Sequence, residues 1–186
     1  MKTSKKTEIL NCAQELIQRR GFNGFSYADI AHLIGIRKAS IHHYFPTKAD
    51  LGIAVVERYR ELFNLALDEI DLEKSLEGKI NRYVSLYKDV LKQDRLCLCG
   101  MLASDLATLE PELQAIVKEF FLDNVAWLSK VLTDEYPSRS KNSVSGIAWQ
   151  IINSLQGATL ISRIMNDTKA FDANCDTLMH QLRQIK

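Results

Sequence analysis

The chain has 186 residues, of which 46% are hydrophobic and 25% are charged, a balance typical of a globular protein and not of a disordered one. The formal net charge of +1 is uneven, because residues 1–50 hold eight Lys or Arg against four Asp or Glu while the remainder holds 16 against 19. No signal peptide, apolar run of ~20 residues or zinc-site cysteine spacing is found, so we expect a cytoplasmic protein with reduced cysteines, no metal and no cofactor.

The first expected helix spans about residues 4–20. Apolar side chains recur along one side of this segment at helical spacing: Ile9, Cys12, Ala13, Leu16 and Ile17. Gly21 follows the last of them and should end the helix.

A second helix should begin at Tyr27. Ser26, followed three residues later by Asp29, is a capping-box pattern, which marks a helix N-terminus. The helix would have one apolar face, made of Ile30, Ala31, Leu33 and Ile34. Gly35 stands where a helix C-terminus favours a residue that tolerates positive φ.

A third, short helix is expected over residues 38–45, with Ile41 and Phe45 on its buried side. Pro46 ends it, because proline cannot donate the next helical hydrogen bond. Its polar and basic side chains are left facing outward: Arg37, Lys38, Ser40, His42, His43 and Tyr44. This pattern predicts a helix-turn-helix with a DNA-reading surface, although a merely solvated helix face is the alternative. The basic excess of residues 1–50 favours DNA.

Residues 35–48, GIRKASIHHYFPTK, resemble the signature of TetR-type transcriptional regulators. The resemblance continues upstream, so that it covers about a quarter of the chain, through Ile9, Ala13, Leu16, Gly21, Phe22, Ser26, Ile30 and Ala31. Three residues depart from the usual family pattern. Arg37 replaces a small capping residue, His42 replaces a tyrosine that touches a phosphate, and Ala28 replaces a basic or polar residue.

The candidate DNA-contacting residues fall into two groups. Lys38, Lys48 and Ser26 suit phosphates, as two cations and a hydroxyl at a helix N-terminus. Arg37, Ser40 and His43 are better suited to base edges. The remaining candidates, which could contact either, are Tyr27, His42 and Tyr44. Because His42 and His43 diverge by about 100° on a helix, they are not expected to grip a metal ion.

The rest of the chain is expected to be helical. Thr47 and Asp50 repeat the capping box and open a long helix to about residue 70. Further helices are expected near residues 74–93, 98–109, 112–134, 142–165 and 171–185. The predicted fold is all-α with about nine helices, divided into a DNA-binding domain at 1–48 and an effector-binding and dimerisation domain at 49–186 without a flexible linker.

The last two helices are candidates for a homodimer interface. The 142–165 segment has an apolar stripe made of Val144, Ile147, Ile151, Leu155, Ala158 and Ile161, and the final segment carries Phe171, Cys175, Leu178, Met179 and Leu182. In proteins that this sequence resembles, these two helices pair with their copies in a four-helix interface. The alternative is that both stripes complete the core of the monomer.

Residues 95–105 resemble a segment that lines the effector cavity in one branch of the family. Cys97, beside Arg95, could be a reactive thiolate or a small apolar core residue. Asp105 follows on roughly the same face, with Met101 between, and could be a polar anchor in a pocket or a surface charge. The other candidates for a ligand cavity are aromatic or amide side chains: Tyr83, Tyr87, Phe120, Asn124, Trp127, Trp149 and Gln156.

The resemblance and the charge distribution together imply a dimeric DNA-binding regulator. We expect a repressor that leaves a palindromic operator when a small molecule or a thiol-reactive compound binds. An all-α interaction protein without DNA binding is one alternative. A helical enzyme using Cys97 or His180 is another, but no base lies near either residue in the sequence, so we do not expect an enzyme.

Overall fold

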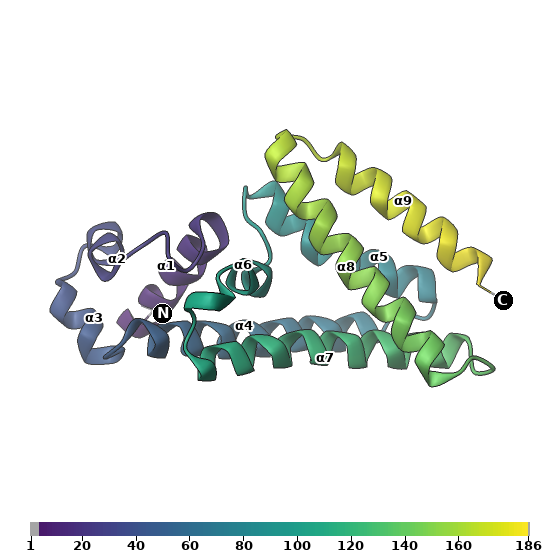
Figure 1. Ribbon diagram of the computed structural model, residues 1–186, viewed down its shortest axis with the longest axis horizontal. Helices are drawn as coiled ribbons and strands as arrows, with labels where there is room; N and C mark the ends of the chain where they lie inside the picture. Colours follow the sequence, from purple (N-terminus) through teal and green to yellow (C-terminus); the bar gives the residue numbers. More distant parts are fainter. Residues whose placement is uncertain (1–3, 186) are drawn as a thin grey trace. The chain divides into compact units, whose positions relative to one another are not determined.

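The computed structural model describes residues 4–185, and within them it consists of nine α-helices and one short 3₁₀ turn, without strands. The helices are α1 (Lys5–Arg20), α2 (Tyr27–Ile34), α3 (Lys38–Tyr44), α4 (Lys48–Asp71), α5 (Leu76–Lys92), α6 (Leu98–Ser104), α7 (Pro111–Glu135), α8 (Lys141–Met165) and α9 (Lys169–Gln184), with the 3₁₀ turn η1 at Leu106–Thr108 (Figure 1). The predicted all-α fold is confirmed. The helix expected at 98–109 is α6 followed by η1.

The helix ends follow local sequence signals. Ser26 N–H donates to Asp29 Oδ2 over 2.7 Å at the start of α2, and Thr47 N–H donates to Asp50 Oδ2 over 2.9 Å at the start of α4. Gly35 ends α2 in the left-handed conformation with φ 67°. Both predicted capping boxes are therefore formed, because each needs only residues three positions apart.

The chain divides into two compact units. The first contains α1, α2, α3, α6, and the parts of α4 and α7 up to Phe63 and Phe120; the second contains the remaining parts of α4 and α7 together with α5, α8 and α9. The functional boundary predicted at residue 48 is a different kind of division and stays a prediction.

The first unit holds the helix-turn-helix on a shared apolar core. Ile30 of α2 and Ile41 of α3 are fully buried, and Ile9, Ala13 and Ile17 of α1 lie in the same core. One prediction for α2 is wrong, because Leu33 is 59% exposed. An α-helix of eight residues makes only about two turns, and Leu33 lies on the side of α2 that faces solvent.

The second unit is built largely from α5, α8 and α9, which pack against one another. The buried side of α8 includes Val144, Ile151 and Leu155, so these three predicted stripe residues belong to the monomer core. Ile161, assigned to the same stripe, lies on the other side of α8 and is 50% exposed. Among the described residues, no helix has the length and apolar character that crossing a membrane would require.

Candidate nucleic-acid interface

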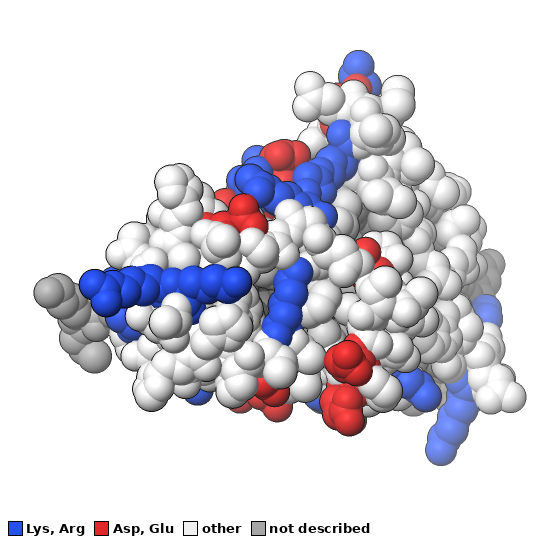
Figure 2. All heavy atoms as spheres, turned by 60° about the vertical axis from the view of Figure 1, so that its left-hand side comes forward, with Lys and Arg blue, Asp and Glu red and all other residues white. Residues whose placement is uncertain are grey.

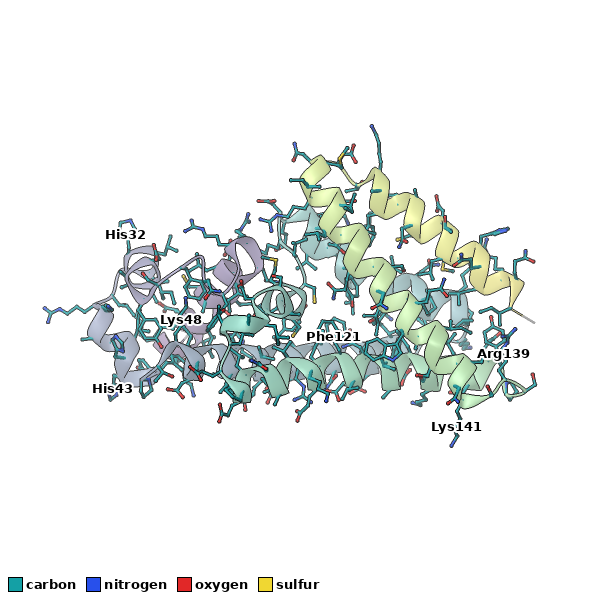
Figure 3. All side chains as sticks on the ribbon, in the orientation of Figure 1. His32, His43, Lys48, Phe121, Arg139 and Lys141 are labelled. Carbon is teal, nitrogen blue, oxygen red and sulfur yellow. The ribbon has the colours of Figure 1, made fainter. Side chains whose placement is uncertain are left out.

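The recognition helix α3 presents most of its surface outward. Ile41 and Phe45 are buried and anchor the helix, as predicted. The side chains of Lys38, Ser40, His42, His43 and Tyr44 are exposed, as is Arg37 at the N-cap. Figure 3 shows His43 projecting outward from α3 and His32 from α2. A seven-residue helix with this much exposed polar surface can enter a DNA groove without unfolding.

The charge on this part of the molecule favours an anionic partner. Figure 2, which brings the helix-turn-helix end forward, shows long basic side chains among uncharged surface. Arg37 and Lys38 open α3, where backbone N–H groups also point outward and can bind phosphate oxygens.

Tyr27 lies inside the helix-turn-helix. It is only 5% exposed, and its hydroxyl donates to Phe45 O over 2.9 Å and also approaches Thr47 O. Burial, with a further contribution from Asp50, raises the pKa of Tyr27 to about 12. The DNA contact predicted for Tyr27 is therefore corrected, because its polar atom is directed at the backbone that follows α3.

His42 bridges the interior and the surface. Its ring lies 4.7 Å from the Tyr27 ring, between centroids, and its Nδ1 is 3.2 Å from Pro46 O. Since a carbonyl oxygen only accepts, Nδ1 carries the proton and Nε2 is left as the atom that an exposed partner can reach. The structure thus leaves His42 available to DNA through one ring nitrogen.

Ser26 and Lys48 both have partners within the first unit. The Ser26 hydroxyl donates to Asp29 Oδ2 over 2.7 Å, and this bond is the largest cause that lowers the pKa of Asp29. The Lys48 ammonium donates to the carbonyls of Phe22 and Phe25 and lies 4.8 Å and 4.2 Å from their ring centroids. The Lys48 ammonium therefore lies against the turn between α1 and α2, inside the first unit (Figure 3).

Asp105 is hydrogen-bonded to the turn between α1 and α2. It follows α6, and its Oδ2 accepts from Phe22 N over 2.7 Å and from Asn23 N over 3.4 Å. Met101 lies beside the same turn, since its methyl carbon is 3.8 Å from the position of a Cβ on Gly21. Both residues therefore lie against the α1–α2 turn.

Cys97 and Phe120 belong to an aromatic cluster in the first unit. Tyr59 and Phe63 of α4 lie 5.5 Å and 5.1 Å from Phe120, between ring centroids. The Tyr59 side chain is hydrogen-bonded to Cys97, and burial raises the pKa of Tyr59 well above its ordinary value. The sequence interpretation missed Tyr59 and Phe63, although their spacing of four residues on a long helix was the available signal.

Four other candidates form a second cluster, in the second unit. The Tyr83 hydroxyl donates to Asn124 Oδ1 over 2.9 Å and lies 3.3 Å from the Tyr87 hydroxyl. The Tyr83 ring stacks on Trp127 with 5.5 Å between centroids. Trp127 Nε1 is buried and has no hydrogen-bond partner among the described residues.

The predicted cavity residues are divided between the two compact units. Trp149 is exposed on α8, and Gln156 is half-buried there with its Nε2 buried and unpartnered among the described residues. Four pockets described for the second unit lie along α5, α7, α8 and α9, with volumes of about 220–370 Å³. None of these four is lined by a predicted cavity residue. Residues 4–185 also contain no group of three His, Cys, Asp or Glu side chains able to hold a metal ion.

Comparisons with known proteins agree with the helix-turn-helix geometry. The model of the family described as "Bacterial regulatory proteins, tetR family" matches residues 9–55. The crystal structure of a TetR transcriptional regulator from Legionella pneumophila has a TM-score of 0.91 and 32% identity, over 97% of this chain and 98% of that chain. An HTH-type transcriptional regulator in the lacX 3' region of Lactococcus lactis subsp. lactis is 21% identical over 97% of this chain and 94% of its own. The HTH-type transcriptional repressor NemR of Escherichia coli K12 is 25% identical over 68% of this chain and 66% of its own.

Proposed function

Because this chain belongs to the TetR family of bacterial transcriptional regulators, whose members bind DNA and are not enzymes, we propose that it binds a palindromic operator as a homodimer. We further propose that it represses transcription until a small-molecule effector releases it from DNA. The repressor role is supported by the relative NemR, which is named as a repressor.

The exposed face of α3 is the single observation that carries the DNA-binding proposal. Arg37, Ser40 and His43 are the residues we propose to read base edges, since an arginine directed at guanine is the commonest specific contact. Lys38 is proposed to contact a phosphate, and His42 and Tyr44 a phosphate or a base. Ser26 and Lys48 would have to give up internal hydrogen bonds to reach a phosphate, so we propose no direct phosphate contact for either residue.

A mobility-shift or anisotropy titration with DNA from upstream of the protein's own gene tests this proposal. Arg37→Ala should weaken specific binding by ~1–3 kcal/mol and relax preference at one base position. Arg82→Ala, an exposed arginine on α5, removes the same charge and should leave base preference unchanged. Wild-type protein that binds no duplex at low salt would support the interaction-protein alternative.

The homodimer is proposed to form mainly through the outward side of α8. This side carries exposed apolar residues at helical spacing, namely Trp149, Leu160, Ile161 and Ile164, with Met165 beside them. Gly146 and Gly157 lie on the same side, and a Cβ at either would meet nothing within 4 Å. A large exposed apolar patch of this kind commonly marks a protein interface, and two-fold symmetry would pair two recognition helices with two half-sites.

The effector is proposed to be a small, uncharged aromatic molecule that binds at the cluster of Tyr83, Asn124 and Trp127. A buried indole N–H without a partner favours a ligand that offers a hydrogen-bond acceptor. Fluorescence of Trp127 in a Trp149→Phe background can detect such compounds, because the chain has two tryptophans. A compound that releases DNA without changing Trp127 fluorescence would argue for another site.

A further inference from the structure

The turn between α1 and α2, residues 21–26, is held by groups from outside the helix-turn-helix. Two of its backbone N–H groups donate to the carboxylate of Asp105, which follows α6. Two of its carbonyl groups accept from the ammonium of Lys48, at the start of α4. All of these residues belong to the first compact unit. The turn leads directly into Ser26, the N-cap of α2, so its position fixes where the helix-turn-helix begins.

Asp105 supplies the carboxylate side of this arrangement. Its Oδ2 is 2.7 Å from Phe22 N, a short hydrogen bond of the kind that a charged acceptor forms. Gly21 makes room for it, because a Cβ at that position would lie 2.9 Å from Asp105 Oδ2, and the φ of Gly21 is +79°. The adjacent Thr108 hydroxyl accepts from Asn23 Nδ2 over 2.8 Å. The turn is thus fitted to the end of α6 by backbone shape as well as by charge.

Lys48 supplies the cationic side. Its ammonium donates to Phe22 O and Phe25 O and lies over the rings of both residues. Burial lowers the pKa of Lys48, while Asp105 and Asp29 act in the opposite direction. The cation therefore has four neighbours within the turn that compete with any phosphate for it.

We propose that Asp105 and Lys48 are positioning residues for DNA binding, which hold the α1–α2 turn so that α2 and α3 can meet the DNA. This inference rests on the proposed function, and it extends the DNA-binding machinery to a residue outside the 9–55 segment that the family model matches. Asp105 acts through Phe22 and Asn23 and touches no DNA.

Whether Asp105→Ala weakens or tightens DNA binding distinguishes a positioning role of Asp105 from a purely electrostatic one. Removing an acidic charge from a DNA-binding unit should by itself tighten binding, because it reduces repulsion of phosphates. Positioning requires the opposite, and Asp105→Ala should weaken binding to DNA from upstream of the protein's own gene by about tenfold. The salt dependence should stay the same, since no phosphate contact is removed.

The conservative variant and a matched control complete the experiment. Asp105→Asn keeps an oxygen acceptor for Phe22 N–H and should recover part of the affinity, whereas Asp134→Ala, at an exposed aspartate on α7, should not weaken binding. Amide hydrogen exchange at Phe22 should accelerate in Asp105→Ala and much less in Asp105→Asn. Unchanged or tighter DNA binding by Asp105→Ala would overturn the inference, whereas wild-type protein that binds no DNA would overturn the proposed function itself.

Lys48→Met tests the other side of the turn. Methionine keeps much of the apolar stem but not the cation, so we expect weaker binding with an unchanged salt slope. If Lys48 instead contacts a phosphate, the slope of log K against log salt should fall by about 0.9. That result would overturn the positioning role of Lys48.

Discussion

At the connection between α3 and α4, the Tyr27 hydroxyl is hydrogen-bonded to the protein backbone. Tyr27 reaches past α3 to Phe45 O and Thr47 O, which belong to the connection between the recognition helix and α4. Pro46 interrupts this connection and has no N–H of its own. The tyrosine therefore links the start of one helix to the end of the next.

Tyr27→Phe should lower the free energy of unfolding by about 1–2 kcal/mol, because the ring still packs but the hydroxyl that donates to the buried Phe45 carbonyl is lost. Urea denaturation measures this difference. Tyr44→Phe, at an exposed tyrosine of α3, is the control and should change stability little. Equal effects of the two substitutions would contradict a special role for the Tyr27 hydroxyl.

The same hydroxyl gives a pH dependence with a definite sign. The pKa of Tyr27 is about 12 in the folded protein and about 10 in an unfolded chain. The protonated form is thus favoured by folding, and its contribution is complete below pH ~10 and lost as the pH rises toward ~12. Stability measured across this window should fall more steeply in wild-type protein than in Tyr27→Phe.

The cysteines are placed for packing more than for reaction. Cys97 is 3% exposed and Cys99 is fully buried, and burial raises the pKa of Cys99 well above its ordinary value. Cys12 and Cys175 are half-buried, and burial raises the pKa of each. A thiolate is the reactive form, so these surroundings favour a non-covalent effector.

Alkylation of native protein with iodoacetamide at pH 8 tests this interpretation. Cys12 and Cys175 should react slowly, and Cys97 and Cys99 only after unfolding, as read by mass spectrometry of peptides. Cys97 modified first in the folded protein would instead support the thiol-reactive route predicted from the sequence.

Residues whose partners lie nearby in the chain were predictable, whereas residues with distant partners were not. Ser26 with Asp29 and Thr47 with Asp50 cap helices three residues away. Asp105 and Phe22 are 83 positions apart, and Tyr27 and Phe45 are 18 apart. No periodicity connects such pairs, which is why the sequence did not reveal the internal partners of Tyr27, Lys48 and Asp105.

At the scale of the element, α8 has two apolar sides, of which one is buried and the other exposed. One side, which includes Ile151 and Leu155, is buried in the monomer, and the other carries the exposed Ile161 and Ile164. An apolar pattern on a helix with two such sides does not reveal which one faces the core. The helix that the sequence analysis assigned to the dimer stays a proposal, and most of the stripe named for its interface is buried in the monomer.

Ile164→Asp should dissociate the proposed dimer. Ile164 is 79% exposed in the monomer, and losing one buried isoleucine per protomer costs roughly 3–6 kcal/mol per dimer, since the change counts twice. Leu72→Asp is a matched control, because Leu72 is 81% exposed and lies after α4. Sedimentation velocity should show a monomer for Ile164→Asp and a dimer for Leu72→Asp, and a dimer in both would exclude this side of α8.

At the scale of the whole molecule, charge and symmetry act together. Residues 1–50 hold eight Lys or Arg against four Asp or Glu, and the remainder holds 16 against 19. A dimer doubles the basic region as well as the recognition helix. One seven-residue helix contacts few base pairs, so we expect operator affinity to depend on both copies of the proposed dimer binding the same duplex.

Dimerisation and DNA binding should therefore be lost together. Ile164→Asp should bind a palindromic operator at least about 100-fold more weakly than wild type, because linking two binding units raises affinity by 10²–10⁴. The slope of log K against log salt concentration should fall to about half, because one helix-turn-helix releases half as many counterions as two. Leu72→Asp changes the net charge equally, which isolates the contribution of dimerisation from that of charge. Titrations of both variants at several salt concentrations measure the affinity and this slope together. An unchanged slope in a monomeric Ile164→Asp would mean that a single helix-turn-helix makes all the phosphate contacts.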